Sequence, residues 1–498
     1  MIAKTDWLTA RVRATPVALA LIIGDQQWSY RELDQVVNRY CLGLQQAGVA
    51  AGHHIAVLLP NRLPYVALIH ALARIGAVLV PLNTRLTAAE IQWQLTQSDA
   101  QLLIHGEEFA DVVGQLVPDA SCRFVPLATL ATEAEQEPEI LHTPPFQLDA
   151  PQAIVFTSGT TGRPKGAVLS FANHFWGATA SSYRLGLSPQ DRWLSCLPLY
   201  HVGGLAVVFR SSLYGTAIVL HERFDLDAFD KSLDNDAITL TSVVPTMLHR
   251  LLTRRQGKPW PASLRHILLG GAAATPELLE LARHSNAPVA TTYGLTEAAS
   301  QVATMRPEDV IHKPGAVGKP LMFSTVRIVD EAGKTLPAGE KGEIVVSGPT
   351  VMIGYYKNPE ATAKVIRTNA AGGRELYTGD IGYLDEDGDL WPVQRRSDLI
   401  VSGGENVYPA EVEAVLRQHP AVADACVVGI PDPEWGERVA ALVACQPTAQ
   451  VTEEGLATFT RARLAGYKQP RLIRFIDALP QTASGKIERH TVCKLLIA

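Results

Sequence analysis

Several features are scarce in this sequence of 498 residues, and each absence removes a class of function. The 6 cysteines form no C-x-x-C pair and have no neighbouring pair of histidines, so a zinc or thiol-redox motif has no support. We expect reduced and mostly buried thiols, as in a cytoplasmic protein. No run of Lys or Arg concentrates positive charge, and the net charge is -6. This balance argues against a nucleic acid or an anionic membrane as the partner.

Long apolar runs are also missing. Residues 1–16 lack the uninterrupted apolar core of a signal peptide, and the longest apolar stretch, residues 66–82, is interrupted by His70 and Arg74. We therefore expect no segment that is inserted in a membrane. What is present is a globular composition with 47% hydrophobic residues. The length suggests about three domains of ordinary size, enough to bury a large core without disulfides or metals.

Alternating strand and helix signals in the first third of the chain predict sheets covered by helices. Ser29 and Glu32 form a capping-box sequence that begins an apolar helical pattern, and Gly48 supplies its stop. A second helix is expected over residues 65–75, ending at Gly76. Continuous apolar runs predict buried strands over residues 55–59, 78–80, 153–156, 217–220, 240–244 and 267–269.

The pattern changes twice towards the C-terminus. Gly, Pro and short alternating runs over residues 325–329 and 342–346 predict a β-rich subdomain at about residues 311–396. The remaining residues carry enough helix and strand signal to fold as a compact unit. The expected fold class is α/β: a large N-terminal domain of helix-covered sheets with the β-rich subdomain (residues 1–396), and a small mobile α+β C-terminal lid domain (residues 397–498).

The most informative segment is TSGTTGRPKG at residues 157–166, which follows an expected strand. Its small residues let backbone N–H groups form an anion-binding nest, and its hydroxyl groups and lysine add donors and charge. We expect it to hold a polyphosphate, and an ordinary surface turn is the less favoured interpretation. It is not the Walker loop of P-loop NTPases, because Gly162 is followed by Arg163 where that motif requires lysine. The expected phosphate contacts are Thr157, Ser158, Gly159, Thr160, Thr161, Gly162 and Lys165.

This decamer resembles the signature of the adenylate-forming superfamily, which contains acyl- and aryl-CoA synthetases, luciferases and the adenylation domains of peptide synthetases. Further segments match that family in its order along the chain, so the resemblance covers nearly the whole sequence. They are LPLYH at 197–201, TYGLTE at 292–297, YTGD at 377–380, residues 395–408 and PQTASGK at 480–486. The resemblance implies an enzyme that converts a carboxylate and ATP into an acyl adenylate and pyrophosphate, and then passes the acyl group to CoA with release of AMP.

The resemblance also assigns roles in ATP binding. In residues 292–297, Tyr293 would stack on adenine, Thr296 would bond the α-phosphate and Glu297 would hold Mg²⁺, which suits an aromatic face, a hydroxyl and a hard oxygen ligand. Without the other segments, this stretch would be interpreted equally well as a strand end followed by a helix cap. Thr292 and Gly294 accompany these residues, and Gly270, Gly271 and Ala272 would form the other wall of the adenine and acyl pockets.

Two more assignments depend on the order of the family's segments. Asp380 resembles the acceptor for the ribose hydroxyls, with Arg395 as a second contact, although a lone Asp after Gly is usually a turn residue. Lys486 would reach from the small domain to the carboxylate and phosphate oxygens and promote adenylation. A solvated terminal lysine is the alternative interpretation.

The second half-reaction needs a hinge and a CoA site. The family hinge falls on Ser397, where many relatives carry Asp or Lys, and Asp398 beside it leaves the position open by one residue. Gly403 and Gly404 would let pantetheine pass close to the backbone. Trp435 resembles an aromatic that packs on the CoA adenine, and Arg85 resembles a CoA phosphate contact. A surface Trp or Arg also has many ordinary explanations.

The stretches around residues 201–215, 269–274 and 293–305 resemble the subgroup of CoA ligases that activates 2-succinylbenzoate in menaquinone or phylloquinone biosynthesis. Because that substrate is a dicarboxylate, polar groups should line a pocket of small residues such as Gly270, and the polar candidates are Ser300, Gln301, Thr304 and Arg210. Arg210 is equally interpretable as a residue on the surface of a helix. His201 could contact the substrate carboxylate or be a structural histidine.

The sequence thus predicts a ligase acting on a small carboxylic acid, with ATP, Mg²⁺ and CoA as co-substrate. Alternatives are a benzoate-type or medium-chain acyl-CoA ligase, an adenylation domain that loads a carrier protein, and a nucleotide-binding regulator without catalysis. Retention of Lys486 and Glu297 argues against the regulator, because a sensor needs neither. The sequence leaves the oligomeric state open, a homo-oligomer included.

Overall fold

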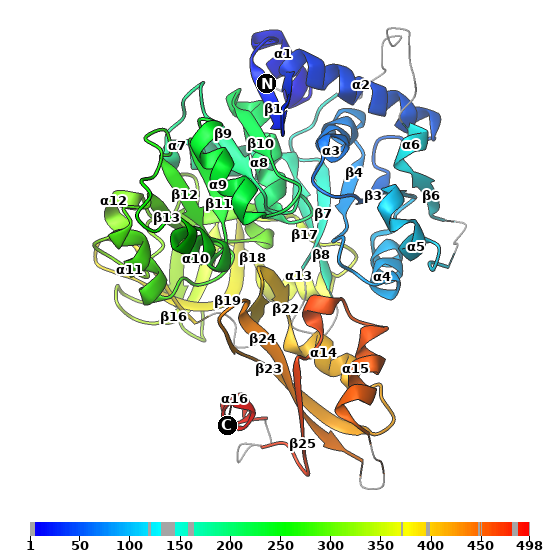
Figure 1. Ribbon diagram of the computed structural model, residues 1–498, viewed down its shortest axis with the longest axis vertical. Coiled ribbons are helices and arrows are strands. Elements are labelled where there is room, and N and C mark those ends of the chain that lie inside the picture. The colour runs from blue at the N-terminus through cyan, green and yellow to red at the C-terminus, as the bar shows by residue number, and fades with distance from the viewer. Residues whose placement is uncertain are drawn as a thin grey trace. The chain divides into compact units, whose positions relative to one another are not determined.

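A computed structural model of the chain describes residues 5–117, 121–130, 145–157, 164–369, 372–394, 399–446, 449, 451–480 and 487–497. The chain forms two compact units. The large unit comprises residues 1–84, 95–155 and 166–393, and the small unit comprises residues 85–94, 156–165 and 394–498. The observed class is mixed α/β, as the sequence predicted (Figure 1).

The first helices show how the local sequence sets element boundaries. Helix α2 (Tyr30–Gln46) begins with the predicted capping box, in which the Ser29 side chain and the Glu32 side chain each bond the other residue's backbone N–H. Helix α3 (Leu63–Ile75) ends at Gly76, whose φ of 78° is the left-handed conformation that glycine adopts without cost. Arg74 is buried on α3 and pairs with Asp6 before α1 (Trp7–Ala14) and with Asp34 on α2.

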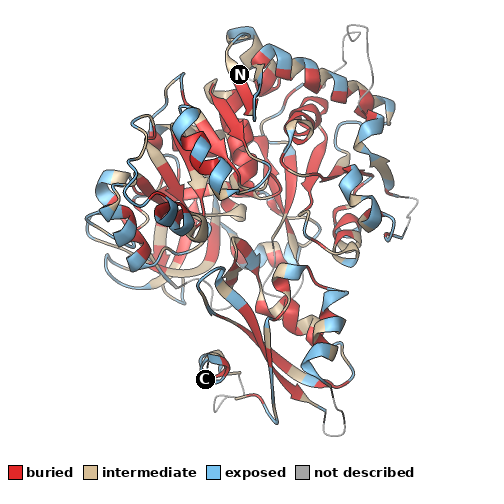
Figure 2. Ribbon diagram, viewed as in Figure 1, coloured by how far each residue is buried: buried red, intermediate tan, exposed pale blue. Residues whose placement is uncertain are grey.

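A seven-stranded sheet has the order β17-β8-β7-β4-β3-β5-β6. Its central strands pair in parallel and are buried on both faces, which explains their continuous apolar sequences (Figure 2). The predicted strands over 55–59, 78–80 and 153–156 are confirmed as β3, β4 and β7. The strands are β3 (His54–Leu58), β4 (Val78–Pro81), β5 (Leu102–His105), β6 (Arg123–Pro126), β7 (Pro151–Thr157), β8 (Lys165–Ser170) and β17 (Gly354–Tyr355).

An eight-stranded sheet has the order β14-β13-β12-β11-β9-β10-β1-β2. The six strands from β13 to β1 pair in parallel, and β14 and β2 are antiparallel at the two edges. The carboxyl ends of the parallel strands therefore meet at one edge of this sheet. The strands are β1 (Leu19–Ile23), β2 (Gln26–Ser29), β9 (Arg192–Ser195), β10 (Ala217–Leu220), β11 (Leu240–Val243), β12 (His266–Leu269), β13 (Val289–Leu295) and β14 (Ser300–Thr304).

Helices connect the strands of these two sheets. They include α7 (Phe171–Leu185) and α8 (Val202–Tyr214), which pack on each other. The other helices up to residue 310 are α4 (Ala88–Ser98), η1 (Glu107–Phe109), α5 (Ala110–Val113), α6 (Leu127–Leu130), α9 (Leu226–Asn235), α10 (Pro245–Arg254), α11 (Pro276–His284), η2 (Thr296–Ala298) and α12 (Pro307–Val310). In the part of the chain that the structure describes, no helix is both long and apolar enough to cross a bilayer.

A five-stranded sheet completes the large unit, with the order β15-β16-β19-β18 and β20 paired to β19. The pairs β15–β16, β16–β19 and β18–β19 are antiparallel. The strands predicted over 325–329 and 342–346 are confirmed as β15 and β16. The elements here are β15 (Thr325–Val329), β16 (Gly342–Ser347), α13 (Pro359–Val365), β18 (Ile366–Thr368), β19 (Arg374–Leu384) and β20 (Leu390–Gln394).

The small unit contains a second five-stranded sheet, with the order β22-β21-β24-β23 and β25 paired to β24. The long hairpin of β23 and β24 forms its centre, with α14 and α16 packed on β23. The elements are β21 (Ile400–Ser402), β22 (Glu405–Val407), α14 (Pro409–Leu416), β23 (Val422–Asp432), β24 (Gly436–Cys445), α15 (Glu453–Arg461), η3 (Gly466–Lys468), β25 (Leu472–Ile476) and α16 (Arg489–Ile497).

Candidate active site

In the large unit, the candidate ATP residues lie where β13 leaves the carboxyl edge of the eight-stranded sheet. Thr292, Tyr293 and Gly294 are the last part of β13, and Thr296 and Glu297 lie on the single turn η2 that follows. The turn reverses the chain into β14, which pairs back on β13. The segment is therefore a strand end followed by a short helical turn, and its roles in binding ATP and Mg²⁺ stay a prediction.

The backbone of this reversal is tight. A Cβ on Gly294 would lie 1.7 Å from the carbonyl oxygen of Ser300, so only glycine fits beneath the returning chain. Ala299 and Ser300 have φ values of 53° and 96°, which residues other than glycine seldom adopt. Strain of this kind persists where the surrounding structure holds it, and it is commonly found at functional sites.

Tyr293 and Asp380 are joined although they are far apart in sequence. Tyr293 is buried in β13, and its hydroxyl donates a 2.7 Å hydrogen bond to Asp380 Oδ2. Asp380 lies in β19 and is half-buried. The tertiary structure thus brings together the residues assigned by resemblance to the adenine and to the ribose.

The Glu297 carboxylate has a partner that the sequence did not suggest. The hydroxyl of Tyr355 in β17 donates a 2.8 Å hydrogen bond to Glu297 Oε1, and the Met352 N–H donates to the Glu297 carbonyl at 2.9 Å. Glu297 is half-buried and is followed on η2 by the buried Ala298. Glu297 follows Thr296 on η2, and a carboxylate has the hard oxygen chemistry that Mg²⁺ requires.

A different group of carboxylates has a different role. Asp385, Asp387 and Asp389 have oxygens close enough together to suggest a cation site. However, the Lys313 ammonium donates to all three at 2.6 to 2.8 Å. These three hydrogen bonds raise the pKa of Lys313, which keeps it charged. The cluster is therefore balanced by a residue of the chain itself.

The segment after β12 forms a second side of the candidate site. A Cβ on Gly270 would lie 2.8 Å from Thr292 Cγ2, so the missing side chain lets β12 and β13 end close together. Gly271 has a φ of 80°, and Ala272 after it is half-buried. The chain continues to Thr275, whose side chain caps α11.

The candidate substrate residues on β14 form a polar network. Thr304 is fully buried, and its hydroxyl lies 2.8 Å from the Thr292 hydroxyl and accepts from Gln301 Nε2 at 3.0 Å. Gln301 Oε1 is buried and has no hydrogen-bond partner among the described residues. Ser300 is half-buried at the start of the strand. The structure brings these three predicted residues onto one strand beside Thr292.

Helix α8 carries two further predicted residues. His201 is its N-cap, is half-buried, and packs its ring 4.7 Å from that of Tyr200. Arg210 is 4% exposed, so its interpretation as a residue on the helix surface is wrong: α8 is a core helix with nearly all of its residues buried. Its guanidinium lies 5.4 Å from the Trp193 ring, and Nε has no hydrogen-bond partner among the described residues.

His174 on α7 is a buried polar residue that the sequence interpretation missed. It is 3% exposed, and neither of its ring nitrogens has a hydrogen-bond partner in the described part of the chain. Burial, together with the nearby charge of Arg210, lowers the pKa of His174 to about 3, so the ring is neutral at pH 7. The only sequence signal was a histidine within an apolar helical run, which is normally explained by core packing.

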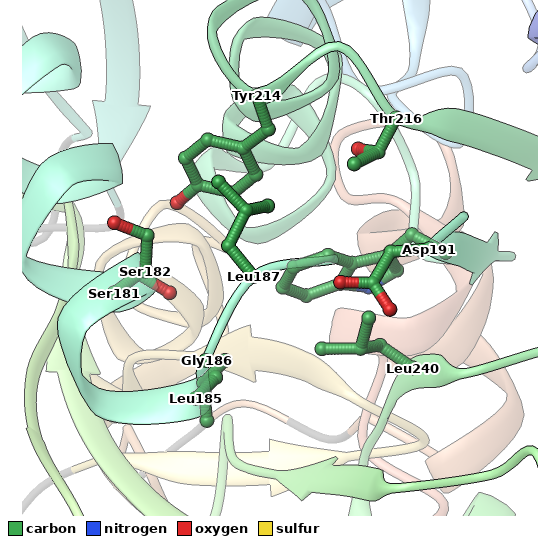
Figure 3. A pocket seen from close by; sticks show the side chains of 10 residues that line it. Ser181, Ser182, Leu185, Gly186, Leu187, Asp191, Tyr214, Thr216 and Leu240 are labelled. Atoms are coloured by element: carbon green, nitrogen blue, oxygen red, sulfur yellow. The ribbon is translucent and has the colours of Figure 1, made fainter. Parts of the chain in front are cut away.

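A pocket in the large unit lies at the opposite edge of the eight-stranded sheet (Figure 3). Asp191, Thr216 and Leu240 line it at the amino ends of β9, β10 and β11, and Tyr214 projects into it from the end of α8. Its wall also includes Trp193, on which Arg210 lies. The pocket is therefore separate from the carboxyl edge that carries the candidate ATP residues.

In the small unit, the predicted CoA residues gather around the β21–β22 turn. Gly403 and Gly404 form this turn with φ values of 60° and 85°, and a Cβ on Gly403 would lie 2.6 Å from the Trp435 ring. Trp435 is 41% exposed, so one side of its ring covers the turn and the rest remains accessible. Arg85 pairs with Glu405 at 3.5 Å and lies 4.7 Å from the Tyr467 ring.

The predicted phosphate loop is described only at its two ends. Thr157 closes β7 and Lys165 opens β8, and the Thr157 hydroxyl donates to the Lys165 carbonyl at 3.4 Å. The loop was expected to run to Gly166, but the strand begins earlier because the Gly166 carbonyl accepts a hydrogen bond from the Tyr356 N–H at 2.8 Å. The predicted residues Ser158, Gly159, Thr160, Thr161, Gly162, Arg395, Ser397 and Lys486 lie outside the described residues.

Comparisons with known proteins find similarity over nearly the whole chain. A family model described as "AMP-binding enzyme" matches residues 8–356, and one described as "AMP-binding enzyme C-terminal domain" matches residues 411–486. A 2-succinylbenzoate–CoA ligase of Bacillus licheniformis is 43% identical over 486 residues, which cover 97% of this chain and 98% of the relative.

Solved structures are similar over the same length. A double mutant of o-succinylbenzoate CoA synthetase (MenE) from Bacillus subtilis, bound with its product analogue, matches with a TM-score of 0.90 and 38% identity, covering 98% of each chain. The same enzyme in complex with ATP and a magnesium ion matches with a TM-score of 0.74 and 38% identity, covering 99% of each chain.

Proposed function

The chain belongs to the AMP-binding enzyme family, and we propose that within this family it is the acid–thiol ligase that joins 2-succinylbenzoate to CoA. In the first half-reaction a carboxylate oxygen of the acid attacks the α-phosphorus of ATP, and the bond to pyrophosphate breaks. In the second, the CoA thiolate attacks the carbonyl carbon of the acyl adenylate, and AMP leaves. Adenylation supplies the leaving group that a free carboxylate lacks.

The observation that carries the choice of acid is the buried guanidinium of Arg210. A buried charge is costly unless it is paired, and the structure gives this one a ring contact and no ion pair among the described residues. Burial lowers the pKa of Arg210, which reflects the same cost. A second carboxylate on the substrate supplies the missing partner, and an acid with a single carboxylate does not.

His174 supports the same recognition. Its neutral ring offers one N–H donor and one acceptor, and both lie unused close to Arg210. A dicarboxylate can accept the N–H bond while it pairs with the guanidinium. The polar network of Gln301 and Thr304 adds further donors on β14.

The nucleotide site is assigned to the β13–η2–β14 reversal and β19. Tyr293 stacks on adenine, Asp380 accepts from the ribose, and Thr296 bonds the α-phosphate. Glu297 would hold Mg²⁺, and its half-buried carboxylate, which accepts from the Tyr355 hydroxyl, fits a hard cation. When bound, the metal ion neutralises charge on the ATP phosphates. Residues 157–165 hold the phosphates, with Lys165 supplying charge.

The small unit is assigned to the second half-reaction and to Lys486. Gly403 and Gly404 let pantetheine pass close to the backbone, the exposed part of the Trp435 ring packs on the CoA adenine, and Arg85 contacts a CoA phosphate. Lys486 serves adenylation, and a domain boundary at residue 396 with a hinge at Ser397 lets one small domain serve both steps. These assignments accord with the matches to both family models.

The experiment that tests the proposal is a pyrophosphate-release screen over aromatic and aliphatic acids, with and without CoA. We expect 2-succinylbenzoate to be converted to the acyl-CoA with release of AMP and pyrophosphate. The kcat/KM for benzoate and for medium-chain acids should be at least about 100-fold lower, because these acids offer no carboxylate to pair with the buried Arg210 guanidinium. Equal turnover of benzoate would place the chain with the benzoate-type ligases. Formation of ADP in place of AMP would contradict the proposed attack on the α-phosphorus.

Two broader features belong to the proposal. ATP and CoA are available in the cytoplasm. The structure describes all 6 cysteines, no disulfide joins them and four of them are buried, which suits a reducing compartment. The partners are small molecules, and we propose a homo-oligomer as the state to be tested by light scattering.

A further inference from the structure

The Tyr355 hydroxyl and the Glu297 carboxylate meet across 58 positions of sequence, at 2.8 Å. Glu297 lies on a turn that contains three residues, so the turn alone holds its side chain only weakly. The hydroxyl bonds Oε1 and restrains rotation of the carboxylate. A contact to one oxygen fixes the direction in which the other oxygen points.

Both partners are held by their own backbones. The Glu297 carbonyl accepts from the Met352 N–H at 2.9 Å, three residues before Tyr355. Tyr355 pairs with Ala167 in the β17–β8 ladder, and its N–H donates to Thr362 Oγ1 at 2.9 Å. The hydroxyl of Tyr355 is therefore presented from a fixed strand.

The residues after Tyr355 are anchored separately. The Tyr356 hydroxyl donates to Asp99 Oδ2 at 2.6 Å, and Lys357 pairs with the same carboxylate at 2.6 Å. Asp99 and Lys357 have φ values of 48° and 49°, a conformation that costs free energy in both residues. The two adjacent tyrosines thus bond two different carboxylates, one in the candidate site and one outside it.

We propose that Tyr355 is a positioning residue for Mg²⁺–ATP, acting through the carboxylate of Glu297. This inference rests on the proposed function, in which Glu297 is the metal ligand. Hydrogen bonds from outside a metal site orient the ligands, and their loss costs about 10- to 100-fold in metal affinity. Tyr355 itself contacts neither nucleotide nor substrate in this proposal.

The test is equilibrium binding of α,β-methylene-ATP, which the enzyme cannot cleave at the α-phosphorus, measured by calorimetry with Mg²⁺ and with EDTA. Tyr355→Phe should raise the Kd for this nucleotide about 10-fold when Mg²⁺ is present, and it should leave the Kd in EDTA unchanged. Tyr356→Phe is the matched control, because it removes a neighbouring hydroxyl that bonds Asp99, and it should behave as the wild type. Pyrophosphate release by Tyr355→Phe should recover at saturating Mg²⁺.

A second variant keeps the inference testable if Tyr355→Phe is unstable. Glu297→Gln should also weaken the Mg²⁺ dependence, and the double variant should be no worse than Glu297→Gln alone, because Tyr355 acts only through that carboxylate. A wild-type Mg²⁺ dependence in Tyr355→Phe, or an equal loss of binding in EDTA, would overturn the inference. These binding results do not depend on which acid is activated, so they separate this inference from the proposed substrate.

Discussion

The hydroxyl of Tyr293 donates a 2.7 Å hydrogen bond to Oδ2 of Asp380, and thereby links β13 of the eight-stranded sheet to β19 of the five-stranded sheet. One oxygen of the carboxylate is thus committed to the protein. The aromatic ring and the carboxylate, assigned to the base and to the sugar of one nucleotide, are held in fixed relation before any ligand arrives. Such preorganisation reduces the entropy that binding must overcome.

Tyr293→Phe keeps the ring and removes this link. We expect KM for ATP to rise on the order of 10-fold with a smaller change in kcat, because a hydrogen bond to a charged group contributes roughly 1.5–3 kcal/mol. Pyrophosphate exchange at varied ATP measures the effect, and KM for the acid serves as the internal control. An unchanged KM for ATP would contradict the assignment of Tyr293 and Asp380 to the nucleotide site.

Arg210→Met tests the recognition of a dicarboxylate. The substitution removes a buried charge and keeps much of the apolar stem, so the unliganded protein should be at least as stable as the wild type. The KM for 2-succinylbenzoate should rise by about 30-fold or more, since loss of one partner of a buried charge pair costs about 2–5 kcal/mol. The KM for ATP should stay nearly constant. A common fall in activity together with a lower melting temperature would instead indicate a structural role.

Lys468→Met tests a buried ionic cluster in the small unit. Lys468 is 3% exposed, and its ammonium lies 2.7 Å from Glu90 Oε1 and 2.7 Å from Glu411 Oε1. Removing the cation leaves the buried Glu411 carboxyl without its partner and leaves the half-buried Glu90 bonded only to Thr87 in the described part of the chain, so we expect a loss of about 3–5 kcal/mol in unfolding free energy. Chemical denaturation of the full chain measures it. A loss below about 1 kcal/mol would show that the cluster is hydrated in solution.

Glu411→Gln should stabilise the protein, whereas Lys468→Met should destabilise it. Burial raises the pKa of Glu411 above its ordinary 4.5, against the attraction of Lys468, and Oε2 has no hydrogen-bond partner among the described residues. A folded-state pKa above the unfolded value gives stability that is present below pH 4.5 and is lost as pH rises through the raised pKa. The amide imitates the protonated form, so the variant should gain in melting temperature over the wild type as pH rises. Parallel pH profiles would contradict the raised pKa.

His70→Gln tests acid sensitivity of the large unit. Burial lowers the pKa of His70 to about 4, from its ordinary 6.5, so its contribution to stability is present above pH 6.5 and is lost as pH falls towards about 4. The variant removes the titration, and the fall in stability over that window should become shallower by up to about 1.4 kcal/mol per pH unit. His249→Gln, at an exposed position of α10, is the matched control and should follow the wild type.

Much of the fold was predictable because its signals are local. The capping box at Ser29 and Glu32 set the start of α2, and the left-handed Gly76 set the end of α3. The apolar run at 217–220 predicted a buried strand, and β10 confirms it. The five-stranded sheet of the large unit could be predicted only in part, because short strands such as β18 have too few residues to show an alternating pattern.

The sequence by itself determined the chemistry, because residue types in a fixed order state which groups are available to bind a nucleotide and a metal. Only the tertiary structure decided which of these groups meet. It joined Tyr293 to Asp380 and Tyr355 to Glu297 over long separations, and it buried Arg210 without an ion pair among the described residues. The physical reason is that hydrogen bonds and desolvation depend on distances in space, and spacing along the chain does not specify those distances once helices and sheets have packed.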